Sequence, residues 1–283
     1  MTRRTFLAGM VAAFFPIDAF AARKPRLVVW ACGGLADALR ELNAEFARKY
    51  DCRVRFTGGA AGYLTRALVH QYRGQIDVFV ARTATTNPRY LHKYGKMHWM
   101  KLFCASEYVI ITPKGNPARI RTVKDLGRKG VRVAFPPKAA KPSSECVLQI
   151  AEAGGVREQF LRNVVVDGDC PRKFLQRIVS GSVDAAIVER RLALIKGVRG
   201  RVEVIPIPPE IAYHGARCKE KAPFVLILMK GMRERKLAEA FVDFALSERG
   251  RRIMEAHGFI HAHSPKMRKI SKMLSIDRKL LAK

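Results

Sequence analysis

The chain has 283 residues, of which 48% are hydrophobic, and it carries a formal net charge of +29. This length and composition, without repeats or low-complexity segments, exclude a disordered chain and leave room for one or two globular domains. Lysine and arginine are scattered along the whole chain rather than gathered in one stripe, so nucleic-acid binding is not expected. A generally cationic surface favours anionic solutes and acidic partners instead.

The N-terminus has the form of an export signal. Thr2-Arg3-Arg4-Thr5-Phe6-Leu7 resembles a twin-arginine motif, the apolar run 6–15 is too short to cross a bilayer, and Ala19-Phe20-Ala21 is a small-x-small cleavage site. We therefore predict a signal peptide over residues 1–21 and a soluble periplasmic protein that folds before export. In that oxidising compartment, disulfides are the default expectation for the six cysteines.

The first predicted unit runs from Arg26 to Tyr50. A buried strand at 27–30 leads through the turn Cys32-Gly33-Gly34 into an amphipathic helix with apolar residues at helical spacing. Two glycines allow the sharp turn, and the free N–H groups at the helix start attract small anions together with the helix dipole. A strand–turn–helix corner is also an ordinary structural element of α/β proteins. This turn alone therefore does not decide between a ligand site and a purely structural corner.

Further strands and helices alternate along the chain. A strand at 52–56 is followed by Ala60, Ala61 and Gly62 at a second helix start, where backbone amides could again meet a ligand. Apolar runs predict strands at 76–81, 107–112, 131–135, 163–166, 183–188, 202–207 and 224–229. Between them we expect helices at 87–94, 122–126, 145–153, 171–179, 237–246 and 250–256. The alternation predicts an α/β architecture with a parallel sheet.

Four strand-to-helix corners carry residues suited to ligand binding. They are 32–34, 59–62, 143–146, where Ser143-Ser144-Glu145 offers a helix N-cap, and 169–171, where Pro171 begins a helix. Ligands of parallel α/β sheets bind at such corners. Two corners lie in the first part of the chain and two in the middle, so we expect two lobes that face each other across a cleft.

Six segments, taken in order, resemble the periplasmic molybdate-binding proteins, the solute receptors of an ABC-type importer. They are LADAL at 35–39, GQIDVFVA at 74–81, TPKGNP at 112–117, VKDL at 123–126, GSVDAAIV at 181–188 and FVDFALSERGRRIMEAHGF at 241–259. The resemblance covers residues 26–259. It implies a two-lobed periplasmic-binding-protein-like α/β fold, in which crossing strands join the lobes and a hinge motion closes the ligand cleft.

The resemblance also implies a domain organisation. The first lobe would comprise residues 25–107 and 224–265, and the second lobe residues 108–223, with hinge segments near 107–112 and 222–228. Lys266 to Lys283 would remain as a basic C-terminal tail. We expect this tail to be a solvated helix or a frayed end that could contact an acidic partner.

At the family's ligand positions this chain differs from the usual pattern. The family's serines fall on Gly34 and on Ala60, Ala61 or Gly62, and its Pro-Ala-Gly corner falls on 142–144, where Ser143 and Ser144 stand. Hydroxyl donors are therefore lost in the first lobe and gained in the second.

The family's oxyanion-binding tyrosine falls on Glu189. A tetrahedral oxyanion needs hydrogen-bond donors, and an ionised carboxylate offers only acceptors. Glu189 would repel such a ligand unless it were protonated or paired, with Arg190, Arg82 or Lys141 as the candidate partners.

Cysteines near the same corners leave a second ligand class open. Cys32, Cys146 and Cys170, together with Glu189, would suit a soft or borderline cation such as Zn²⁺ or Cu⁺. The favoured alternative is a disulfide between Cys146 and Cys170 inside the second lobe, with Cys32 simply small and buried. Three histidines at 257, 261 and 263 are expected to be structural.

We therefore predict a non-enzymatic periplasmic protein, monomeric and without a cofactor, that captures a molybdate-like or tungstate-like oxyanion for an inner-membrane ABC permease. The ligand would meet backbone amides of the first lobe at Cys32, Gly33, Gly34, Ala60, Ala61 and Gly62, and Ser143, Ser144, Cys170, Pro171 and Glu189 of the second. A soft-metal receptor and a ligand sensor are the alternatives. An exported thiol enzyme is disfavoured, because no Cys–His or Ser–His pair stands at local spacing.

Overall fold

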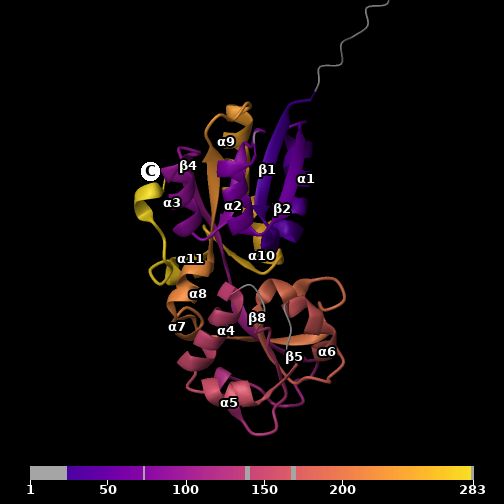
Figure 1. Cartoon of the computed structure of the whole chain (residues 1–283). Helices are drawn as coiled ribbons and strands as arrows, with labels where there is room; N and C mark the ends of the chain where they lie inside the picture. Colours follow the sequence, from indigo (N-terminus) through magenta and orange to yellow (C-terminus); the bar gives the residue numbers. More distant parts are fainter. Residues whose placement is uncertain (1–23, 73, 138–140, 167–169, 282–283) are drawn as a thin grey trace, which may run out of the picture.

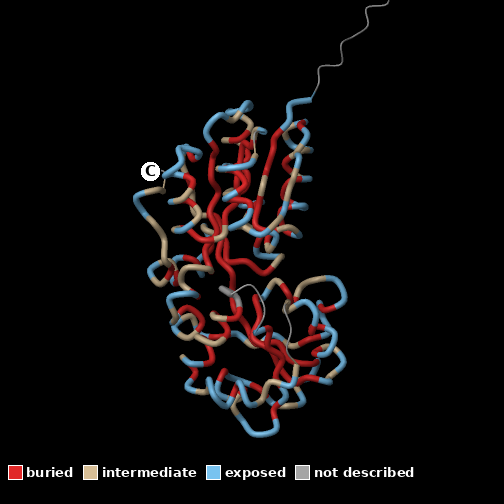
Figure 2. Tube along the Cα trace, viewed as in Figure 1, coloured by how far each residue is buried: buried red, intermediate tan, exposed pale blue. Residues whose placement is uncertain are grey.

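A computed structural model describes residues 24–72, 74–137, 141–166 and 170–281 of the chain. The predicted signal peptide at 1–21 lies outside the described residues. The described chain forms two lobes, one above the other in Figure 1, with a buried core in each (Figure 2). Across the part of the chain that is described, no helix has both the length and the apolar character needed to cross a membrane.

The first lobe is built on a six-stranded sheet with the order β11-β4-β10-β3-β1-β2. Its strands are β1 (Arg26–Cys32), β2 (Arg53–Gly59), β3 (Val78–Arg82), β4 (Met97–Ser106), β10 (Pro223–Met229) and β11 (Phe259–His261). β1 runs parallel to β2 and β3, whereas β10 and β11 pair antiparallel with their neighbours. The sheet is therefore mixed, which corrects the prediction of a parallel sheet, and its ten-residue strand β4 was not predicted.

Helices cover both faces of this sheet. They are α1 (Ala36–Lys49), α2 (Ala61–His70), α3 (Thr86–Lys93), α9 (Arg235–Leu246) and α10 (Glu248–Ala256). On one face, Leu42 and Phe46 of α1 pack with Phe241 of α9 against inward residues of β1. On the other face, Leu64 of α2 packs with Phe79 of β3. The apolar faces of the helices thus hold the helices against the sheet. The carboxyl ends of β1 and β3 then face the second lobe.

The second lobe holds a three-stranded antiparallel sheet, β8-β5-β9, and a two-stranded parallel pair. The strands are β5 (Tyr108–Pro113), β6 (Val133–Ala134), β7 (Val164–Val166), β8 (Ala186–Glu189) and β9 (Val202–Pro206). The helices are α4 (Lys141–Ala153), α5 (Arg157–Arg162), α6 (Leu175–Val179), α7 (Pro209–Ala212) and α8 (Ala216–Lys221). Short 3-10 helices lie at Gly33–Leu35, Val123–Gly127, Pro171–Phe174, Arg190–Leu194 and Arg278–Leu280. Since α4 begins at Lys141, the predicted N-cap at 143–145 is wrong, and these residues lie inside the helix.

The lobes are connected where β4 continues into β5 and where α8 continues into β10, and again by the residues after β11. The N–H of Ser106 donates to the carbonyl of Ala222 at 2.8 Å, so the β4–β5 and α8–β10 connections lie side by side. The N–H of Thr83 donates to the carbonyl of Pro223 at 2.9 Å and extends the same network into β3. Both segments that we predict as hinges begin at this point.

The residues after β11 pack against both lobes. α11 (Pro265–Ile270) buries its apolar face in the core of the second lobe, as does Leu274. Ile276 then forms a β-bridge with Ala84 of the first lobe. The expectation of a solvated or frayed tail at 266–283 is therefore wrong for residues 266–281, because apolar residues at regular intervals hold this segment down despite its charge.

At the end of β11, His261 is fully buried and satisfies both ring nitrogens. Its Nε2 lies 3.0 Å from the carbonyl of Ala245, and its Nδ1 accepts the N–H of His263 at 3.2 Å. One neutral tautomer makes both bonds. Burial lowers the pKa of His261 to about 4, which keeps the ring uncharged at neutral pH.

We expect His261 to make the fold sensitive to acid. Because the pKa in the folded state lies below the ordinary value of 6.5, the contribution to stability is complete above that value and declines as the pH falls towards 4, by up to about 3 kcal/mol. His261→Gln should remove this part of the acid-induced fall in Tm, as measured by thermal unfolding over that pH range. The exposed control His98→Gln should keep it. An unchanged pH profile in His261→Gln would contradict the assignment.

Candidate functional site

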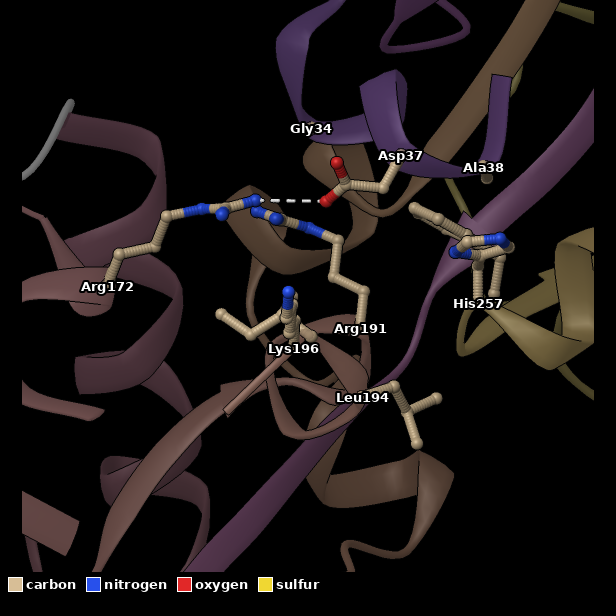
Figure 3. Close-up of a pocket in the computed structure, with 10 residues that line it drawn as sticks. Gly34, Asp37, Ala38, Arg172, Arg191, Leu194, Lys196 and His257 are labelled. Carbon is tan, nitrogen blue, oxygen red and sulfur yellow. Dashed lines mark hydrogen bonds and ion pairs between the residues drawn. The ribbon is translucent and has the colours of Figure 1, made fainter. Parts of the chain in front are cut away.

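A cavity of about 330 Å³ lies between the two lobes (Figure 3). Its lining comes from both lobes: Gly34, Asp37, Ala38, His257 and Phe259 from the first, and Arg172, Arg191, Leu194, Ile195 and Lys196 from the second. The start of α1 forms one wall, and the segment after β8 forms the opposite wall. The cavity therefore lies at the end of a parallel strand of an α/β lobe, which is the usual position of a ligand.

Glu189, the last residue of β8, is buried and holds two arginines. Its carboxylate pairs with Arg82 of β3, in the first lobe, and with Nε of Arg191, two residues further on. Burial acts to raise the pKa of Glu189, but the charges of Arg191 and Arg82 outweigh it and lower the pKa to about 2. Glu189 is therefore ionised, and its charge is compensated inside the protein. Of the partners predicted for Glu189, Arg82 is confirmed.

The other predicted partners do not pair with Glu189 in the described structure. Arg190 instead contacts Glu107, with Nη1 and Oε2 3.4 Å apart. The side chain of Lys141 lies outside the described residues. Arg191 takes the place of Arg190, because β8 ends at Glu189 and the following 3-10 helix turns the second residue, rather than the first, back towards the carboxylate.

Several contacts hold the lobes together around the cavity. Arg172 donates from Nη2 to Oδ2 of Asp37 at 3.2 Å across the cleft. The guanidinium of Arg191 lies against Gly34, 3.7 Å from the position that a Cβ would occupy there. Figure 3 shows both arginines reaching from the second lobe towards the start of α1. The arginine side chains of the second lobe thus face the helix start of the first lobe across the cleft.

Gly258, between His257 and Phe259, packs closely against the segment of the second lobe that carries Arg191. Its φ angle is +82°, a conformation that residues with a Cβ rarely adopt. A Cβ at this position would lie 2.9 Å from the backbone nitrogen of Arg191 and 3.0 Å from Cδ1 of Leu194. Only glycine therefore allows this turn of the first lobe to pack against the segment that carries Arg191.

A second cavity of about 90 Å³ lies on the other side of the two arginines, within the second lobe. Its lining comprises Tyr108, Pro136, Val147, Cys170, Pro171, Arg172, Ile187, Val188, Glu189, Arg191 and Leu192. Arg172 and Arg191 line both cavities. The two guanidinium-bearing side chains are therefore accessible from the interlobe space and from the interior of the second lobe.

The predicted site residues are only partly brought together. Gly34 lines the interlobe cavity, and Cys170, Pro171 and Glu189 line the smaller cavity behind it. These residues come from two of the four corners identified in the sequence, 32–34 and 169–171, and from the end of β8. The structure thus places one residue of the first lobe and three of the second around the same pair of arginines.

The remaining predicted residues lie further away. Cys32 and Gly33 are next to Gly34 in the chain, and Cys32 is only 8% exposed. The helix start at 60–62 is adjacent to them, because Cys32 and Gly59 are register partners, yet it lines neither cavity. Ser144 is buried in α4 and lines neither cavity, and the side chain of Ser143 lies outside the described residues.

The cysteines do not support the predicted disulfide or metal site. All six are free, and Cys146 lies beside Cys218, whose Sγ donates to the carbonyl of Cys146 at 3.4 Å. Cys146 is fully buried between α4 and α8, whereas Cys170 faces the small cavity, so the structure does not join them. Within the described residues, no three His, Cys, Asp or Glu side chains gather as metal ligands. The alternative set of Cys32, Cys146, Cys170 and Glu189 is therefore not assembled.

Four charged residues of the cavity were missed in the sequence: Asp37, Arg172, Arg191 and Lys196. A signal for two of them was present, since Arg172 directly follows Pro171, and Arg191 follows Glu189 by two residues. Long cationic side chains next to a predicted ligand corner are candidates for anion binding.

The sequence profile of the bacterial extracellular solute-binding proteins matches residues 27–260. The chain belongs to this family. The solute-binding protein is 25% identical, over 238 residues, to the molybdate-binding protein ModA of Mycobacterium bovis; the match covers 82% of this chain and 84% of that protein. The predicted resemblance to molybdate-binding proteins is confirmed.

Solved structures show the same fold. A substrate binding domain from Clostridium difficile matches with a TM-score of 0.68 and 16% identity, over 83% of this chain and 98% of that chain. The periplasmic molybdate-binding protein of Azotobacter vinelandii matches with a TM-score of 0.63 and 17% identity, over the same shares. The prediction of a two-lobed α/β fold is confirmed, and the chain is a solute-binding protein of the ABC-transporter type.

Proposed function

We propose that this solute-binding protein captures a small oxyanion, of the molybdate or tungstate type, between its lobes in the periplasm and delivers it to an inner-membrane ABC permease. One observation carries the proposal. Arg172, Arg191 and Lys196 line the two cavities, and Arg82 pairs with Glu189. Against the carboxylates of Asp37 and Glu189, these four cations leave a net charge of +2 (four cations minus two carboxylates). A partly enclosed site with this excess of positive charge favours an anion.

Guanidinium groups can replace the hydroxyl donors that the family has at this site. Arg191 uses Nε to hold Glu189, and its Nη2 lies beside Gly34, where the family has a serine. An arginine presents several N–H donors in one plane, a geometry that suits the paired oxygens of an oxyanion. The ionised Glu189 then orients Arg191 rather than repelling the ligand.

Calorimetric titration with molybdate, tungstate, sulfate, phosphate and Zn²⁺ tests the proposal. We expect at least one oxyanion to bind with a Kd of about 10 µM or tighter. Arg191→Gln should weaken that binding by about tenfold or more, because a hydrogen bond to a charged group contributes about 1.5–3 kcal/mol. Arg252→Gln removes the same charge from an exposed ion pair on α10 and should leave the Kd unchanged. Binding of Zn²⁺ with no response to any anion would overturn the proposal.

A further inference from the structure

The interlobe cavity is chemically divided. Arg172, Arg191 and Lys196 bring positive charge from the second lobe, whereas Ala38, Leu194, Ile195 and Phe259 supply apolar wall. His257 lies away from the arginines in Figure 3, and its Nε2 is 2.8 Å from Oε2 of Glu41. A bare tetrahedral oxyanion would use the cationic part alone and would leave the apolar wall in contact with water.

We infer that the preferred ligand is a phosphomonoester of a small organic alcohol, with its phosphate between Arg172, Arg191 and Lys196 and its carbon body along Ala38, Leu194 and Phe259. This inference rests on one part of the proposed function, the binding of an oxyanionic group between the lobes, and changes the preferred ligand from an inorganic ion to an organic molecule that carries this group.

The volume of the cavity supports a ligand of this size. About 330 Å³ corresponds to the space of roughly ten water molecules in the liquid, at about 30 Å³ each. It also falls at the lower end of the range of about 300–1,000 Å³ that is typical of organic-ligand sites. An ion of five atoms would leave about half of these water positions to solvent, whereas a phosphomonoester of about ten non-hydrogen atoms would occupy nearly all of them.

The charge of the site suits a phosphate ester in particular. A phosphomonoester carries about −1.5 to −2 charges near neutral pH, which matches the net charge of +2 counted for the lining side chains together with Arg82. Lys196 forms no ion pair with any residue that the structure describes, so its charge is available to a ligand. The pair Arg172–Asp37 is about half exposed on both sides, so a phosphate can displace the carboxylate at little cost.

A matched set of three probes separates the two parts of the cavity. Glycerol 3-phosphate carries both the phosphate and the body, inorganic phosphate carries the anion alone, and glycerol the body alone; 2-phosphoglycolate and molybdate complete the calorimetric panel. We expect one of the phosphomonoesters to bind at least tenfold more tightly than phosphate and molybdate, and glycerol to give no signal. Burial of a few apolar carbons against the wall supplies such a difference, at about 0.8 kcal/mol per CH₂.

Two variants test the assignment of each part. Lys196→Gln should raise the Kd of the phosphomonoester by about threefold or more. Lys269→Gln removes the same charge from an exposed position on α11 and should leave this Kd unchanged. Leu194→Ser should reduce the preference for the phosphomonoester over phosphate. If molybdate or phosphate binds as tightly as either phosphomonoester, the inference is overturned and the proposed function stands. If no anion binds at all, the proposed function itself fails.

Discussion

Replacing Glu189 with glutamine is expected to destabilise the protein by roughly 3–5 kcal/mol, because two arginines would lose the carboxylate that compensates them. Glu189 and Arg82 are only 8% and 15% exposed at the side chain, so water cannot replace the lost partner. For a chain of this size the loss corresponds to a fall in Tm of about 6–20 °C. Thermal unfolding followed by circular dichroism measures it.

Glu145→Gln is the matched control for this experiment. Its partner Arg217 lies 2.9 Å away, but the two side chains are 40% and 52% exposed, so the change should cost less than about 1 kcal/mol. Equal effects of the two variants would contradict the burial argument. The pKa of Glu189 also determines how the stability of the fold depends on pH. Because this pKa is lowered from 4.5 to about 2, the contribution of Glu189 to the free energy of unfolding is complete above pH 4.5 and is lost as the pH falls from 4.5 through 2.

Gly258→Ala is expected to weaken ligand binding by about tenfold or more, by preventing full closure of the lobes. The new Cβ would lie 2.9 Å from the backbone nitrogen of Arg191, and backbone atoms cannot move aside as a flexible side chain can. The φ angle of +82° adds backbone strain of about 1–2 kcal/mol. Titration with the tightest oxyanion found for the unmodified protein measures the affinity, and small-angle scattering measures the closure.

Gly181→Ala separates strain from steric exclusion. Gly181 has a similar φ of +77°, but a Cβ there would meet nothing within 4 Å. Gly181→Ala should therefore lower Tm through strain alone and keep the Kd of the unmodified protein. If the two variants bind the ligand equally well, the contact between Gly258 and the Arg191 segment does not limit closure.

Local signals in the sequence predicted most of the individual elements. The strand, turn and helix over 26–50 are present as β1, a 3-10 turn and α1, because periodic apolar residues and a glycine pair define them without reference to the rest of the chain. β2 continues three residues beyond its predicted end, to Gly59. Its last residues pair with Trp30, Ala31 and Cys32, and this pairing overrides the weak strand propensity of glycine.

β4 could not be read from local pattern. Its register against β10 shifts at two places, so burial along MHWMKLFCAS does not alternate with a period of two. Lys101 and His98 further interrupt the apolar run. The antiparallel insertion of β10 between β3 and β4 likewise depends on residues more than a hundred positions apart, which no local periodicity encodes.

In the candidate site, too, local features could be predicted from the sequence, whereas contacts between distant residues could not. The position of Gly34 at a ligand corner and the importance of Glu189 follow from local turns and from the family resemblance. The pairing of Arg172 with Asp37, 135 residues apart, exists only because the lobes fold towards each other. Long arginine side chains reach across such a cleft, so the residue that meets a ligand need not lie at the corner that the sequence identifies.

The segment after β11 has a mechanical consequence for the cleft. The N–H of Ser275 donates to the carbonyl of Lys219 in the second lobe, and the next residue, Ile276, pairs with Ala84 in the first. Adjacent Cα atoms are about 3.8 Å apart, so these two contacts keep the lobes together along this edge, at the left of Figure 1. An opening that keeps both contacts is a rotation about this edge, and it moves the wall that carries Arg172 away from Asp37. Since the family profile ends at residue 260, the segment that makes these two contacts lies outside the region that the family shares.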